Sequence, residues 1–191
     1  MSSTLAARNA LLGSQTPRIQ HVPPYASTTG REAVELAEMA GVYLDEWQQN
    51  VLIHALGEKP DGTWAAPEVG LVCSRQNGKD EILLVRELAG LFLLGERMIV
   101  ATAHQWDTSM EAFLRLRFVI ENCDEFASRV RKFNMTHGQE GITLTNGQRI
   151  RFRTRTAGGG RGFSGDCVIF NEAMDFKAAS LAAWSAVPWL A

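Results

Sequence analysis

The apolar pattern of the first third of the chain predicts two short helices. Apolar residues recur at helical spacing over residues 29–40, just before Gly41, and again over residues 44–56. The second helix carries one apolar stripe, formed by Leu44, Trp47, Val51 and Leu52. Residues 1–30 show no sustained apolar period and contain paired prolines, so we expect a flexible N-terminal arm there.

From residue 68 onward, short apolar runs alternate with helical periods. The expected elements are a strand at 69–73, a polar loop at 74–78, a helix at 79–94, a strand at 98–101 and a helix at 109–121. Strand, helix, strand, helix is the order that builds a parallel sheet with helices on its faces. The sequence therefore predicts an α/β domain over residues 31–191.

Beyond residue 141 the period of the pattern becomes two. Residues 142–145 and 148–156 alternate around Asn146-Gly147, a residue pair typical of a two-residue hairpin turn. Arginines at alternate positions from 149 to 155 share one face of the second strand, which suits either a solvated face or contact with DNA phosphates. A glycine-rich loop, residues 158–162, then leads to an apolar strand at 167–170.

Composition narrows the class of protein without naming a function. The chain has 191 residues, of which 46% are hydrophobic and 21% charged, so it can bury the core of one ordinary domain. No segment has the length and apolar character of a membrane span or a signal peptide, so no membrane partner is expected. The three cysteines have neither disulfide nor metal spacing, and the net charge of −2 gives no overall attraction to nucleic acid.

The loop between the expected strand at 69–73 and the helix at 79–94 is a candidate phosphate-binding loop. Glycine permits close approach of a phosphate, backbone N–H groups at a helix start hold it, and a lysine reaches its outer oxygens. The loop residues are Ser74, Arg75, Gln76, Asn77, Gly78 and Lys79. The general pattern has glycine where this chain has Cys73 and a hydroxyl residue where it has Asp80, so a simple turn is the alternative.

Two other segments carry candidate chemistry. The apolar strand at 167–170 ends in Asn171-Glu172, and a glutamate in this place can polarise an attacking water, although the pair would also serve as a helix cap. Upstream, Gln48 can both donate to and accept from an adenine edge, with Trp47 beside it; a core-facing tryptophan on a helix is the structural alternative.

Together these segments resemble the N-terminal ATPase domain of tailed-phage terminase large subunits. The resemblance spans residues 43–176 and rests on four segments: 44–48, 74–79, 101–109 and 158–173. It implies a P-loop NTPase of the additional-strand catalytic-glutamate type, with a mostly parallel sheet flanked by helices and an N-terminal helical arm. Residues 31–191 would be a C-terminally incomplete ATPase domain, without the nuclease domain that follows it in family members. The resemblance also implies that Lys79 holds the β- and γ-phosphates and that Glu172 activates water.

The remaining roles follow from the same resemblance. Gln48 and Trp47 would receive adenine, and Ser74, Gln76, Asn77 and Gly78 would cradle the phosphates. Arg75 would stabilise the phosphoryl charge within the subunit, whereas Arg161 would do so from a neighbouring subunit.

Two positions depart from the family pattern. Family members usually have aspartate in place of Asn171, and serine, threonine or asparagine in place of Asp80. We hypothesise that Asp80 supplies the charged Mg²⁺ ligand that Asn171 cannot. The opposing interpretation is an impaired hydrolase, because a carboxylate beside a triphosphate is repelled.

The implied function is ATP hydrolysis, with ATP and Mg²⁺, that drives packaging of double-stranded DNA into a viral procapsid. The implied partners are other copies of the chain in a ring, a portal protein and a small terminase subunit, in the host bacterial cytoplasm and transiently at the procapsid. The alternatives are a catalytically impaired nucleotide-binding or assembly module and a helicase-like DNA-dependent ATPase.

Overall fold

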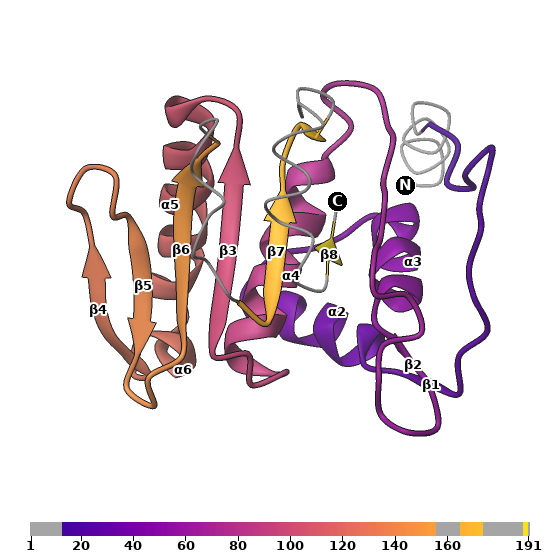
Figure 1. The fold of residues 1–191 in the computed structure, drawn as a ribbon, viewed down its shortest axis with the longest axis horizontal. Helices are drawn as coiled ribbons and strands as arrows, with labels where there is room; N and C mark the ends of the chain where they lie inside the picture. Colours follow the sequence, from indigo (N-terminus) through magenta and orange to yellow (C-terminus); the bar gives the residue numbers. More distant parts are fainter. Residues whose placement is uncertain (1–12, 156–164, 174–188, 191) are drawn as a thin grey trace, which may run out of the picture.

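A six-stranded mixed β-sheet forms the centre of the protein (Figure 1). The computed structural model describes residues 13–155, 165–173 and 189–190. The strand order is β4-β5-β6-β3-β7-β8. The strands are β3 (Met98–Ala103), β4 (Val130–Asn134), β5 (Gly141–Leu144), β6 (Arg149–Thr154), β7 (Cys167–Phe170) and β8 (Trp189–Leu190).

The sheet has an antiparallel part and a parallel part. Strands β4, β5 and β6 pair antiparallel, whereas β6, β3, β7 and β8 pair parallel. The expected parallel pairing is therefore found for β6, β3, β7 and β8, but not for β4 and β5. Because the chain turns back at Asn146-Gly147 within a single hairpin, β5 must run against β6.

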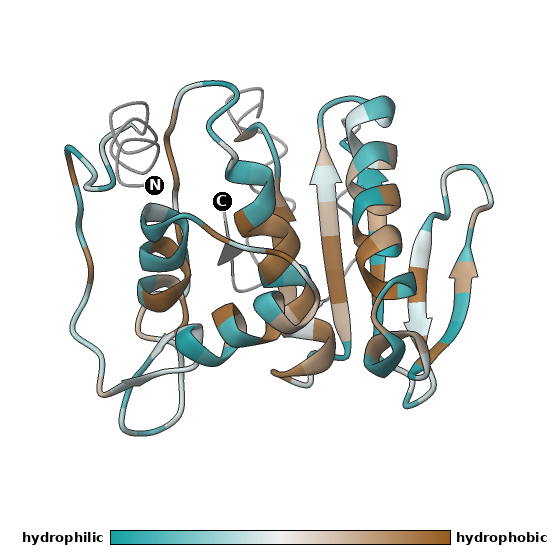
Figure 2. Ribbon diagram, turned by 180° about the vertical axis from the view of Figure 1, so that it is seen from behind, coloured by the Kyte–Doolittle hydropathy of each residue, from teal (hydrophilic) through white to brown (hydrophobic). Residues whose placement is uncertain are grey.

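Two helices cover one face of the sheet. Both α4 (Lys79–Phe92) and α5 (Trp106–Glu121) lie behind the strands in Figure 1 and in front of them in Figure 2. The buried residues of both helices are mostly apolar. Phe113 of α5 packs edge-on against Phe152 of β6, with ring centroids 5.6 Å apart. Burial of such side chains is the main stabilising contribution to this layer.

The N-terminal helices extend this helical layer. Helix α2 (Gly30–Met39) packs on both α3 (Glu46–Ala55) and α4, and a short α6 (Asp124–Ala127) follows α5. Before α2, β1 (Ser27–Thr28) pairs with β2 (Gly57–Glu58). Thr28 Oγ1 also donates to the carbonyl oxygen of Ile53, so the chain is fixed where it enters α2. None of the described helices is long and apolar enough to cross a membrane.

The expected strand at 69–73 is not formed. Figure 1 shows this stretch as extended chain outside the sheet, and no described strand pairs with it. Val72 is fully exposed. A strand requires backbone partners as well as an apolar run, and here the run alone does not provide them.

Strand β7 is anchored at its start to β3. One carboxylate oxygen of Asp166 accepts from the backbone N–H of Arg97 at 2.6 Å and from that of Met98 at 3.0 Å. The N–H of Asp166 in turn donates to the Met98 carbonyl oxygen at 2.8 Å. These bonds fix where β7 begins, and thereby which of its residues reach the carboxyl-end edge of the parallel strands.

Candidate nucleotide site

The loop at residues 74–78 leads into the N-terminus of α4. Gly78 is the N-cap of α4 with φ +77°, a left-handed conformation that favours glycine, and a Cβ there would lie 2.7 Å from Gln48 Nε2. Asn77 Nδ2 donates across the loop to Ser74 Oγ at 2.6 Å. Within the described chain, the N–H groups of residues 75–78 donate no backbone hydrogen bond. The loop therefore offers unpaired donors beside the positive end of a helix, which suits an anion.

Three side chains meet at the edge of the sheet next to this loop. Lys79 Nζ donates to Asp80 Oδ1 at 2.7 Å and to Asn171 Oδ1 at 2.8 Å. Asn171 Nδ2 donates to the same Asp80 oxygen at 3.1 Å. The start of α4 and the residue after β7 thus form one polar cluster.

The oxygens of this cluster fit a hard cation. The Lys79 ammonium contacts both oxygens at once, so the Asp80 carboxylate and the Asn171 amide oxygen can converge on one positive charge. No group of three His, Cys, Asp or Glu side chains in the described part of the chain could hold a metal ion. A Mg²⁺ ion here would take its other ligands from phosphate and water, which is its usual preference.

Glu172 follows Asn171 directly, in an unusual backbone conformation. Its φ is +58°, in the left-handed region that non-glycine residues seldom adopt. The Asn171 N–H continues the parallel pairing by donating to the Thr102 carbonyl oxygen at 2.9 Å. Arg155 donates to the carbonyl oxygens of both Asn171 and Glu172, so the turn that carries the glutamate is held from β6.

Gln48 lies beside the loop, but its amide is already engaged at both ends. Oε1 accepts from the Asp45 N–H at 2.7 Å, which completes a capping box at the start of α3, and Nε2 donates to the Gly78 carbonyl oxygen at 2.8 Å. The side chain is 4% exposed. Each end of the amide therefore already holds one partner within the protein, and contact of Gln48 with an adenine edge stays a prediction. The pattern Asp-x-x-Gln was a readable signal for the cap.

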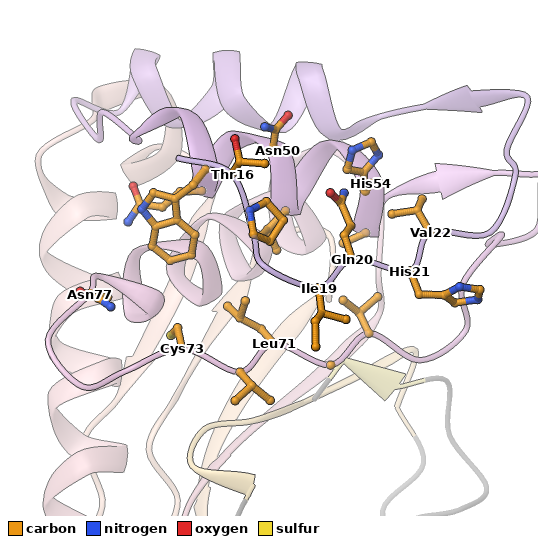
Figure 3. A pocket seen from close by; sticks show the side chains of 18 of the residues that line it. Thr16, Ile19, Gln20, His21, Val22, Asn50, His54, Leu71, Cys73 and Asn77 are labelled. Carbon is orange, nitrogen blue, oxygen red and sulfur yellow. The ribbon is translucent and has the colours of Figure 1, made fainter. Parts of the chain in front are cut away.

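A cleft of about 930 Å³ adjoins the loop (Figure 3). Residues 13–23 form one wall, α3 a second wall, and the extended segment 65–73 a third; Gln76, Asn77 and Gly78 line its end. Figure 3 shows Leu71 and Cys73 opposite Asn50 and Thr16. Trp47 lines the cleft as well, and Gln15 Oε1 accepts from its backbone N–H at 3.2 Å. The volume of the cleft suits a nucleoside.

A second cavity, of about 350 Å³, lies between α4, α5 and the sheet. Asp80 and Asn171 line it together with Glu87, which lies two helical turns beyond Asp80. Burial, opposed by the positive charge of Arg86 and assisted by the negative charge of Asp80, raises the pKa of Glu87 to about 8. Glu87 thus keeps its proton at neutral pH and adds no charge to the site.

The structure does not bring the two predicted arginines, Arg75 and Arg161, into this geometry in the same way: one is exposed and the other is not described. Arg75 is exposed in the loop and makes no side-chain hydrogen bond with any described residue. Arg161 lies outside the described residues, as does the glycine-rich loop around it. Arg155, by contrast, was missed from the sequence, because its partners are identifiable only once β3 is known to lie between β6 and β7.

Known proteins resemble the chain in structure but not in sequence. A scan against protein-family models gave no match, and neither did a search of curated proteins. The large terminase of bacteriophage HK97 aligns with a TM-score of 0.69 and 18% identity over 85% of this chain and 37% of that chain. The ATPase domain of the Thermus phage P74-26 large terminase aligns with a TM-score of 0.58 and 16% identity over 90% of this chain and 70% of that chain.

A mutant of the same Thermus phage domain aligns with a TM-score of 0.57 and 18% identity, over 82% of this chain and 68% of that chain. The chain spans little more than a third of the HK97 protein. It therefore has the fold of the ATPase domain of phage large terminases.

Proposed function

We propose that the chain is the ATPase domain of a phage large terminase, and that it hydrolyses ATP with Mg²⁺ to drive double-stranded DNA into a procapsid. The observation that carries the proposal is the cluster of Lys79, Asp80 and Asn171 beside a loop of free N–H groups. A lysine, a carboxylate and a strand-end polar residue at one helix N-terminus suit a nucleoside triphosphate and its metal. The fold supports the same assignment.

The phosphate end of the substrate would lie over the loop. The N–H groups of residues 75–78, with the side chains of Ser74, Gln76 and Asn77 around them, would hold the phosphates. Lys79 would exchange Asn171 for the β- and γ-phosphate oxygens, and exposed Arg75 would swing in from the loop to neutralise the γ-phosphate. Arg161 of a neighbouring copy would add a second positive charge.

The base end would enter the cleft beside Trp47. Because the Gln48 amide is engaged at both ends, we propose that it acts by fixing Gly78 and the loop, and reads adenine only if it releases one of these partners.

The metal would be held by the Asp80 carboxylate and the Asn171 amide oxygen, since both already converge on one cation. When bound, Mg²⁺ supplies positive charge that neutralises the phosphate oxygens. Asp80 restores the carboxylate that Asn171 lacks, so the total charge of the site is kept. Glu172 would accept the proton of the attacking water, as in NTPases of the additional-strand catalytic-glutamate type.

The wider context is proposed on the same basis. The chain would act as part of a ring of copies, with a portal protein and a small terminase subunit, in the host bacterial cytoplasm and at the procapsid.

The test is Mg²⁺-dependent ATP hydrolysis by the purified chain, with and without duplex DNA. Glu172→Gln should bind ATP and retain only a residual rate of hydrolysis, whereas Lys79→Met should bind ATP about 10- to 100-fold more weakly. Glu125→Gln and Lys59→Met, at exposed positions on other elements, serve as matched controls. Binding without turnover by the unmodified chain, in the presence of duplex DNA, would exclude the hydrolase and favour an assembly module.

A further inference from the structure

The turn at the end of β7 is held by a side chain from another strand. Arg155 follows the last residue of β6, and its backbone N–H donates to the Ala103 carbonyl oxygen at 2.9 Å. Its side chain then extends across β3 toward the end of β7. Nη1 lies 2.7 Å from the Asn171 carbonyl oxygen, and Nη2 lies 2.8 Å from the Glu172 carbonyl oxygen.

The intervening strand takes part in the same contact. Arg155 Nη1 also lies 3.3 Å from the carbonyl oxygen of Thr102 and 3.4 Å from its Oγ1. Thr102 is itself bonded to β7, because its Oγ1 donates to the Ile169 carbonyl oxygen at 3.1 Å. One guanidinium therefore joins the ends of three neighbouring strands.

The residue held in this way is the strained one. Glu172 has φ +58°, and a non-glycine residue keeps such a conformation only where surrounding contacts compensate its cost. Arg155 donates to the carbonyl oxygens of Asn171 and Glu172, which lie on either side of the Glu172 Cα. Hydrogen bonds from a charged donor are stronger than those from a neutral donor. The planar guanidinium of arginine can donate to two carbonyl oxygens at once, whereas the ammonium of lysine is a single point charge.

We infer that Arg155 is a positioning residue for Glu172: it fixes the left-handed turn that carries the glutamate, directly after Asn171 of the Lys79 cluster. The inference rests on the proposed function, in which Glu172 is the catalytic residue. Arg155 acts through the backbone and does not contact the reacting atoms. Its loss should therefore affect turnover and leave nucleotide binding intact.

The experiment compares Arg155→Met, which keeps the length of the side chain, with Arg155→Lys, which keeps its charge. Arg151→Met is the matched control, because Arg151 lies on the same strand face and makes no hydrogen bond to the turn in the described chain. Arg155→Met should lower kcat by about 10²-fold, the cost of a misplacement near 1 Å. The Kd for ATP should change by less than about twofold, since ground-state contacts remain.

A double variant separates positioning from simple loss of stability. Residues that act as a unit are not additive, so Arg155→Met should lower the residual rate of Glu172→Gln no further. An equal fractional loss in both backgrounds, an unchanged kcat in Arg155→Met, or full rescue by Arg155→Lys would each overturn the inference. If Arg155→Met does not fold, Arg155→Lys takes its place, with a smaller loss of kcat expected and the same non-additivity required.

The two proposals can fail separately. If the unmodified chain does not hydrolyse ATP, the proposed function fails, and amide hydrogen exchange then decides the role of Arg155. Faster exchange at residues 171–173 in Arg155→Met than in Arg151→Met supports positioning of the turn, and equal exchange rates overturn it.

Discussion

Lys79 Nζ lies 2.8 Å from Asn171 Oδ1, although 92 residues separate them in the chain. This contact ties the start of α4 to the end of β7, and it gives the lysine a partner before any phosphate is present. Binding of a triphosphate must therefore exchange one oxygen partner for another. The ammonium is held in place beforehand, so little side-chain freedom is lost on binding.

We predict that Lys79→Met weakens ATP binding by about 10- to 100-fold, the value of a hydrogen bond to a charged group. Titration with a fluorescent ATP analogue measures the change, and Lys59→Met provides the control. The folded state should survive, because the Lys79–Asp80 pair is partly exposed and such pairs contribute little stability. An unchanged affinity would show that the lysine does not reach the phosphates.

Variants at Asp80 and Asn171, the two positions that depart from the family pattern, test the metal site. Asp80→Asn should raise the Mg²⁺ concentration for half-maximal hydrolysis by at least about tenfold, since the site then lacks a carboxylate. The double variant Asp80→Asn with Asn171→Asp should restore the original dependence, because the two positions share one cation. The measurement is a Mg²⁺ titration of ATPase rate. If neither variant alters the titration, charge compensation is wrong.

Gln48→Ala should destabilise the protein by about 1–2 kcal/mol, because it removes half of a capping box and leaves the Gly78 carbonyl without its amide donor. Chemical denaturation measures the loss. Gln49→Ala is the matched control: among the described residues the Gln49 side chain makes one hydrogen bond, to the Leu44 carbonyl oxygen, so its loss should destabilise the protein less. ATP affinity should fall only in the Gln48 variant, and an equal fall in both would contradict a role in fixing the loop.

The free energy of unfolding should fall as the pH rises, because Glu87 is protonated in the folded protein. Its pKa is about 8 in the folded protein, well above the ordinary value of 4.5. Between these two values the unfolded chain has lost the proton that the folded chain retains, so the free energy of unfolding falls, and the loss is complete above the folded pKa. Glu87→Gln should flatten this dependence. Urea unfolding from pH 5 to about 9 measures it, and parallel curves for the two proteins would be the contrary result.

The buried pair of Arg86 and Glu96 gives a prediction about stability alone. The two side chains are 4% and 8% exposed and form a two-point ion pair, while Arg86 Nε has no partner among the described residues. Glu96→Leu should lower the free energy of unfolding by about 3–5 kcal/mol, because it leaves the buried guanidinium of Arg86 without its ion-pair partner. Adding Arg86→Met should recover most of this loss in thermal denaturation. Additive losses in the double variant would contradict the pairing.

Much of the fold could be predicted because local pattern and tertiary structure agree. Residues 167–170 form a strand with the expected bounds, and α4 begins at the expected Lys79, since buried strands and amphipathic helices have clear periods. The stretch at 69–73 has an equally apolar pattern and forms no strand, because strand formation also requires a neighbouring strand that pairs with the backbone. Strand β4 was missed because Arg131 and Lys132 interrupt its apolar positions.

The site was predictable in its residue types more than in their contacts. Gly78, Lys79 and the pair Asn171-Glu172 carry recognisable chemistry in the sequence, and the structure brings Lys79 and Asn171 together. The second partner of Gln48 depends on how α3 packs against the loop, which no local pattern records. The left-handed turn at Glu172 also escapes prediction, because its residue type does not favour it.

Strand β7 is held at both ends, by the Asp166 carboxylate just before its first residue and by the Arg155 guanidinium just beyond its last. It cannot slide along its axis without breaking both sets of bonds. A pull exerted on Asn171 by a ligand must therefore be absorbed within the few residues that follow Phe170. In the proposed motor, movement at the nucleotide would therefore bend the turn at residues 171–172 and leave β7 in place.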